Sequence, residues 1–293
     1  MRGVEPELQP FWDERAAGNF IGGGTGAGLL LWSAIAASGH GTAIGLPLFL
    51  ALAFIGAGLF CVWMEIGRPL RALNVFFHAR TSWMTREAIV AGPLFLCGLI
   101  AMLSGWLFFA WLAALIGLVF LYCQARILQA ARGIPAWREP ALLPLIVVTG
   151  LAEGAGMLAL LSPLLVRSPG AEFAFPLLVL VVLRFWLSRR YAAHLARPNN
   201  APLKTLRALR ENDRHFLLLG HTLPAAVLVI ALFAGGSFGT ALLALAGIAV
   251  AASGWLFKLA LITRIAYTQG FALQHVPART PGYSHPGVKP GWN

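Results

Sequence analysis

Long apolar runs, separated by short polar segments, dominate the chain. A membrane-spanning helix needs about 20 mainly apolar residues, and eight stretches reach or approach that length. We predict these spans at residues 16–38, 44–64, 87–104, 106–126, 140–162, 173–190, 215–234 and 239–263. The pattern therefore predicts an all-α, polytopic membrane helix bundle with eight transmembrane helices.

Composition agrees with a single integral membrane domain over residues 1–293. The mean hydropathy is +0.75, and only 11% of residues are charged, against roughly 25% in soluble domains. The longest polar stretch, about 191–214, is too short to bury a core of its own. The first fifteen residues are polar and acidic, unlike a signal peptide, so the first span is expected to direct its own insertion.

Basic residues are distributed unevenly between the two faces that these spans define. The loops 65–86, 127–139 and 191–214 lie on the same side as both termini. Together with the tails and the span ends beside them, they carry 19 of the 22 Lys and Arg residues. Those that lie elsewhere are Arg167, Arg184 and Lys258. The positive-inside rule predicts an inner-membrane protein with both termini in the cytoplasm. A basic surface that docks an acidic partner would give the same bias, whereas no module for nucleic-acid binding is recognisable.

The segment between the second and third spans concentrates charge at the edge of the membrane. Glu65 ends the second span and Glu87 begins the third. Four arginines lie between them: Arg68, Arg71, Arg80 and Arg86. Carboxylates at a membrane edge are costly unless they are paired or functional. Either the two acids neutralise these arginines, or they form a site that handles protons at the mouth of the bundle.

Ionisable side chains inside the predicted spans are further functional candidates. These are Glu153, Arg184, His221 and Lys258. Glu153 lies roughly 20 Å deep, and the other three lie roughly 10 Å from the inner ends of their spans. These three would form a polar layer at one level, which would suit a quinone head group. Glu153 either pairs with Lys258 or is a protonated carboxyl in a proton path. Lys258 alternatively extends to the interface, and His221 equally fits an interhelical hydrogen bond.

Two features of the spans add to this picture. Glycines at 18, 22 and 26 are spaced for close helix packing, and Asn19 is a polar amide in the inner turn of the same span. Pro224 interrupts the seventh span and is expected to free the carbonyl of Gly220, beside His221.

No metal site, haem or iron–sulfur cluster is expected in the chain. The three cysteines lie in apolar spans without CxxC spacing, and they are interpreted as packing residues. Of the seven histidines only His221 lies well within a span, which argues against a haem with two histidine ligands. Residues 1–15 and 265–293 are rich in aromatic residues, Gly and Pro, without helical periodicity. We predict that they dock onto another subunit, the alternative being disordered ends with an interfacial Trp belt.

The segment around residues 65–88 resembles the NrfD/DmsC-type membrane anchors of molybdenum iron–sulfur oxidoreductases. That family has a His-Leu-Gly-x-Pro-like turn here and an acidic residue at the start of span three. This chain reads EIGRP at 65–69, so Glu65 stands where a histidine is common. Glu87 stands where the quinol-linked glutamate of the family falls, and Asn19 is carried over from related quinone pockets.

The resemblance implies a quinone-reactive anchor without independent catalysis, as in anaerobic respiration. It would pass electrons between a ferredoxin-like iron–sulfur subunit, which accompanies a molybdopterin catalytic subunit, and ubiquinone or menaquinone. The catalytic candidates are Glu65 and Glu87, and the quinone-binding candidates add Asn19, Arg68 and His221 to these two.

The two ends of the chain are most similar to the anchor of phenylacetyl-CoA:acceptor oxidoreductase. The similar segments are WDERAAGNFIGGGTG and ITRIAYTQGFALQHVPAR, and they imply that the catalytic partner oxidises phenylacetyl-CoA. The alternatives are a proton- or ion-translocating membrane protein and a purely structural anchor without its own quinone site.

Overall fold

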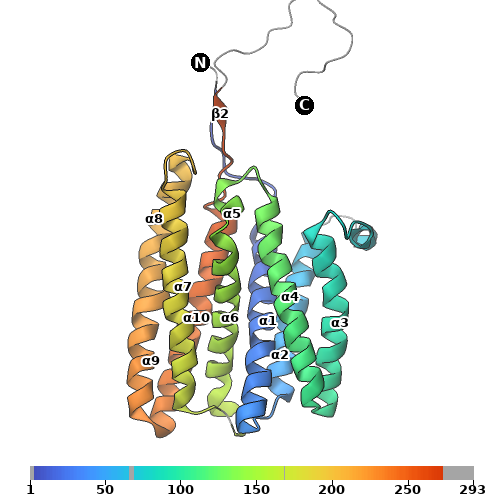
Figure 1. Cartoon of the computed structure of the whole chain (residues 1–293), viewed down its shortest axis with the longest axis vertical. Coiled ribbons are helices and arrows are strands. Elements are labelled where there is room, and N and C mark those ends of the chain that lie inside the picture. The colour runs from blue at the N-terminus through green and yellow to red at the C-terminus, as the bar shows by residue number, and fades with distance from the viewer. Residues whose placement is uncertain (1–2, 66–68, 168, 273–293) are drawn as a thin grey trace, which may run out of the picture.

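The computed structural model describes residues 3–65, 69–167 and 169–272, which form one bundle of long helices (Figure 1). Within these residues, eight helical segments are long and apolar enough to cross a membrane. This confirms the predicted all-α fold and the number of spans. The segments are α1 (Glu14–His40), α2 (Gly45–Glu65), α3 (Trp83–Ser104), α4 (Leu107–Ala130), α6 (Leu142–Leu161), α7 (Ala174–Leu195), the continuous run from α8 (Leu203–Leu217) through η4 (Leu218–Thr222) to α9 (Leu223–Ala234), and α10 (Gly236–Thr263).

Helices α1 and α6 lie at the centre of the bundle (Figure 1). Helix α1 packs against α2, α4, α6 and α10, and α10 continues the contacts to α9. Helices α2, α3 and α4 lie on one side of this centre, which we call the first flank, and α7, α9 and α10 lie on the other, the second flank. The N- and C-terminal segments emerge at the same end of the bundle, which we call the tail side.

Glycines let α1 approach its neighbours closely, as the spacing predicted. A methyl group added at Gly22 or Gly26 would lie within 2.4 Å of a backbone carbonyl oxygen of α2. One added at Gly28 would lie 2.2 Å from the carbonyl oxygen of Gly150 in α6. Because backbone atoms cannot yield as a flexible side chain does, larger residues here would force the helices apart.

The structure differs from the predicted boundaries chiefly at the basic stretch 191–214, which is mostly helical. Helix α7 continues to Leu195, and α8 begins at Leu203 after Pro202. Helix α8 is amphipathic, so its charged residues lower the average hydropathy without breaking its helical periodicity. Span three likewise begins earlier than predicted, because the Ser82 hydroxyl accepts a hydrogen bond from the Thr85 amide and caps α3 at Trp83.

The two tails pair with one another on the tail side. Strand β1 (Gly3–Val4) is antiparallel to β2 (Phe271–Ala272), and Leu8 forms a further bridge with Tyr267. The Gln9 side chain joins this ribbon to the bundle by donating to the Ile262 carbonyl at 3.1 Å. The short helices of the loops are η1 (Pro69–Phe77), α5 (Pro135–Arg138), η2 (Ser162–Leu164) and η3 (Ala171–Phe173). Most of the predicted C-terminal docking segment, from residue 273, lies outside the described residues.

Candidate functional site

Four helix ends meet on the tail side of the first flank. Asp13 caps the start of α1, accepting a hydrogen bond from the Arg15 amide at 2.8 Å, and Ser82 caps the start of α3. Helices α2 and α4 run in the opposite direction and end at the same level, at Glu65 and Ala130. Side chains within two turns of these four ends are thereby brought to one place.

Glu87 lies at the centre of this place, in the second turn of α3, and its side chain is buried. Its Oε1 accepts a hydrogen bond from Asn19 Nδ2 at 3.1 Å and another from Gln124 Nε2 at 3.0 Å. Gln124 Nε2 also donates to the Asn19 carbonyl at 2.9 Å. Gly23 leaves the space for this amide, since a methyl group there would lie 2.2 Å from Gln124 Nε2.

Two buried acceptor atoms of this cluster lack a hydrogen-bond partner within the described residues. Among the described residues, Asn19 Oδ1 and Gln124 Oε1 are buried without a hydrogen-bond partner. Glu87 forms no ion pair within the same part of the chain. Buried polar atoms without partners are costly. A bound molecule whose hydroxyl donates a hydrogen bond to one of these oxygens would therefore stabilise the cluster.

A cavity of about 140 Å³ adjoins Glu87. Its lining residues come from the N-terminal segment and the first four helices: Trp12, Ala16, Asn19, Phe20, Val62, Glu65, Met84, Glu87 and Ile127. The cavity is therefore mostly apolar and aromatic, with one amide and two carboxyls. It is smaller than the roughly 300–1,000 Å³ of sites that enclose drug-sized ligands. Its size and lining suit a single ring with polar substituents whose tail extends outside.

The structure brings together three of the residues singled out from the sequence, Asn19, Glu65 and Glu87. His221 is not among the described residues that line this cavity, and Arg68 lies outside the described residues. Sequence reasoning missed Gln124 and Trp12. Trp12 lies before α1, where its ring stacks on Trp137 with centroids 4.8 Å apart. Gln124 could have been noticed as a lone amide in an apolar span.

Arg80 and Arg86 of the loop do not neutralise the two acids. Arg86 donates to the carbonyls of Ala79 and Arg80, and its guanidinium lies 4.1 Å from the centre of the Trp83 ring. Ion pairs from Arg80 or Arg86 to Glu65 or Glu87 are absent in the part of the chain that the structure covers. For Arg80 and Arg86, simple neutralisation is therefore not the explanation of this charge pattern.

A second polar cluster lies between α1, α6 and α10. Lys258 Nζ lies 2.6 Å from Glu153 Oε2, and both side chains are fully buried. Lys258 therefore pairs within the bundle and does not extend to the interface. Thr25 donates to the same carboxylate oxygen at 2.9 Å, and Lys258 also donates to the Phe20 carbonyl at 2.8 Å.

Two glycines make room for this ion pair. A methyl group at Gly24 would lie 2.2 Å from Lys258 Nζ, and one at Gly254 would lie 2.5 Å from Glu153 Oε1. That second carboxylate oxygen has no hydrogen-bond partner among the described residues. Phe20 connects the two clusters, since its carbonyl accepts from Lys258 and the residue also lines the cavity at Glu87.

A third cluster surrounds Arg184 on the second flank. Arg184 donates to the Val250 carbonyl at 3.0 Å, to the Ser253 hydroxyl at 3.2 Å and to the Gly220 carbonyl. Pro224 lacks an amide hydrogen, and the chain forms a π-helix over η4 immediately before it. The freed Gly220 carbonyl predicted from the sequence is therefore satisfied by Arg184. His221 Nδ1 lies 3.0 Å from the Phe216 carbonyl oxygen.

Comparison with known proteins places the chain in a family. The family model for the DMSO reductase anchor subunit (DmsC) matches residues 20–213, about two thirds of the chain. The chain therefore belongs to the DmsC family of DMSO reductase anchor subunits. The matched region contains Glu65, Glu87 and Glu153, whereas Asn19, His221 and Lys258 lie outside it.

A curated relative is one of the subunits of the sulfite dehydrogenase of Allochromatium vinosum. It is 30% identical over 173 residues, which cover 53% of this chain and 52% of the relative. The chain thus matches about half the length of this relative.

Proposed function

We propose that the chain is the quinone-reactive membrane subunit of a multisubunit molybdenum iron–sulfur oxidoreductase. The observation that carries this proposal is the buried Glu87 carboxyl, held by Asn19 and Gln124 at the wall of a small aromatic cavity. A quinone ring is flat and apolar, with an oxygen at each end that accepts a hydrogen bond when oxidised and donates one when reduced. Amides and a carboxyl beside an apolar wall match both states.

The proposed roles follow from the proton balance of the reaction. Reduction of a quinone to a quinol consumes two electrons and two protons, and the reverse reaction releases them. Glu87 would exchange a proton at the ring oxygen, while the two amides orient the ring. Glu65 lies at the end of α2, is partly exposed and lines the same cavity. It would exchange protons with the aqueous phase at the cavity mouth.

Electrons would come from, or return to, a partner subunit on the tail side. The family consists of anchors of DMSO reductase, which supports an iron–sulfur subunit and a molybdopterin-bearing catalytic subunit as partners. The paired tails project from the same end of the bundle at which the cavity lies. Leu8 and Phe11 expose 40% and 81% of their surfaces beside this ribbon, so this end would offer the partner apolar contacts next to the quinone.

The substrate of the catalytic partner is a separate question. The resemblance of the two terminal segments favours phenylacetyl-CoA oxidation, and a coenzyme A thioester would be a cytoplasmic substrate. The relative from Allochromatium vinosum is named for sulfite instead. We retain phenylacetyl-CoA as a prediction that concerns the partner, because no residue of this chain would bind that substrate.

Partial filling of the cavity tests the proposed function. Ala16 lines the cavity and is buried, so Ala16→Leu would place added carbons where the ring is proposed to bind. We expect the KM for quinone to rise by about tenfold, equivalent to about 1.4 kcal/mol of binding, while reduction of a soluble dye is unchanged. Ala37→Leu, at the far end of the same helix, is the matched control. An unchanged KM in a fully assembled Ala16→Leu complex would exclude this cavity.

The proposed orientation predicts the location of the C-terminus. The tails and the loops that are rich in Lys and Arg lie at the same end of the bundle. The positive-inside rule therefore places the tail side in the cytoplasm. We expect a fluorescent protein fused after Asn293 to be active, and an alkaline phosphatase fused there to be inactive. An active phosphatase at this position would reverse the proposed orientation.

A further inference from the structure

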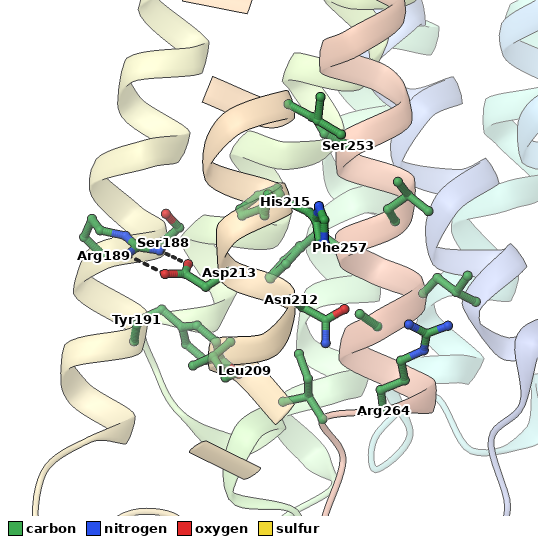
Figure 2. A pocket seen from close by; sticks show the side chains of 17 residues that line it. Ser188, Arg189, Tyr191, Leu209, Asn212, Asp213, His215, Ser253, Phe257 and Arg264 are labelled. Atoms are coloured by element: carbon green, nitrogen blue, oxygen red, sulfur yellow. Dashed lines mark hydrogen bonds and ion pairs between the residues drawn. The ribbon is translucent and has the colours of Figure 1, made fainter. Parts of the chain in front are cut away.

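A larger cavity, of about 290 Å³, lies between α7, α8 and α10 on the tail side (Figure 2). It shares no lining residue with the cavity at Glu87. Its lining extends from Ser253 in α10 to Arg264, which directly follows that helix, and this corresponds to about 16 Å along the helix axis. The cavity is therefore elongated along the helices, as a site for an extended molecule would be.

The side of this cavity is apolar and reaches the surface that faces lipid. Leu219 and Leu256 line it and expose 47% and 59% of their surfaces. Both residues belong to membrane spans, so this exposed surface faces acyl chains. Phe216 and Phe257 stack on one another at its inner wall, with ring centroids 4.8 Å apart. A hydrocarbon chain would thus enter from the bilayer without crossing water.

The tail-side end of the cavity is polar and positively charged. Arg264 and Asn212 lie at this end, and Ser253 lies at the other (Figure 2). Arg189 is paired with Asp213 in the cavity wall, so the acid of this wall is already neutralised. Arg264 forms no ion pair with any residue that the structure describes.

We propose that this cavity binds an anionic glycerophospholipid. Its phosphodiester would lie beside Arg264 at the tail-side end, and one acyl chain would extend along Leu219 and Leu256. Charge complementarity selects this occupant, because a neutral quinone ring gains little from an unpaired guanidinium at the membrane edge. The lateral opening towards lipid, flanked by Leu219 and Leu256, favours an occupant from the bilayer over a soluble phosphate.

The test measures lipid binding by the purified full-length chain in detergent. Thermal unfolding is followed with added phosphatidylglycerol, phosphatidylcholine or inorganic phosphate, and retained lipids are counted by native mass spectrometry. We expect phosphatidylglycerol alone to raise the unfolding temperature. Arg264→Gln should weaken its apparent affinity by about tenfold, as expected for loss of a charge-assisted contact. Leu256→Trp, which fills the opening, should weaken it similarly.

Matched variants make the result specific to this cavity. Arg190→Gln removes an exposed cation from α7 that does not line the cavity, and Leu245→Trp alters an equally exposed leucine of α10 away from it. Both should respond to phosphatidylglycerol as the wild type does. Equal protection by phosphatidylcholine, equal protection by inorganic phosphate, or equal losses in the Arg264 and Arg190 variants would each overturn the proposal. None of these readouts depends on quinone activity.

Discussion

Replacing Lys258 by Met is expected to destabilise the folded chain by about 3–5 kcal/mol, because it leaves a buried carboxylate without its cation. Glu153 and Lys258 are both fully buried, 2.6 Å apart, and no other cation of the described residues pairs with Glu153. Glu153→Gln should also destabilise the chain, since it leaves the ammonium group unpaired. The double variant Glu153→Gln/Lys258→Met should recover most of the loss, because a buried pair can often be replaced by neutral residues.

Thermal unfolding in detergent checks this prediction. Lys204→Met is the control, since the pair of Lys204 with Glu5 is exposed and surface pairs contribute about 0–1 kcal/mol. The same variants decide between a structural pair and a proton path. If Glu153 carries protons, Glu153→Gln would retain quinone turnover while the pH gradient formed in vesicles disappears. Single variants as stable as the wild type would contradict the structural role that we favour.

The fold could be predicted from the sequence to a large extent, because apolar length is a strong local signal. Glycine spacing also indicated correctly that α1 would pack closely on its neighbours. The average hydropathy concealed α8, whose charges alternate with leucines on a regular helical period. A periodicity measure would have extended the seventh span back to Leu203.

The site could be predicted only in part, because depth along a span does not determine which helices are neighbours. The sequence placed His221 and Glu87 near the inner ends of their predicted spans, yet Glu87 belongs to α3 and His221 to η4, on opposite flanks of the bundle. Gln124 was missed because its role depends on a residue of another helix: Gly23 of α1 leaves the space that the Gln124 amide occupies. A single sequence carries no signal for such a contact between helices far apart in the chain.

The second large effect is expected at Glu87. Glu87→Gln keeps the size of the side chain but removes its charge and its exchangeable proton. Because a positioned acid–base group contributes about 10²- to 10⁴-fold to a rate, we expect quinone-linked kcat to fall by at least about a hundredfold. The bundle should still assemble, since Asn19 and Gln124 can hydrogen-bond to the new amide oxygen. Glu65→Gln should have a smaller effect, as Glu65 lies at the cavity mouth.

The ratio of quinone-linked to dye-linked turnover in the Glu87→Gln complex tests the proposed quinone site most directly. A soluble dye takes electrons upstream of the membrane subunit, so it reports that the partner subunits are intact. Glu211→Gln, at an exposed position of α8, is the matched control and should leave the ratio unchanged. We predict a ratio about a hundredfold below that of the wild type for Glu87→Gln. Full quinone activity in both Glu87→Gln and Glu65→Gln would show that quinone reacts elsewhere.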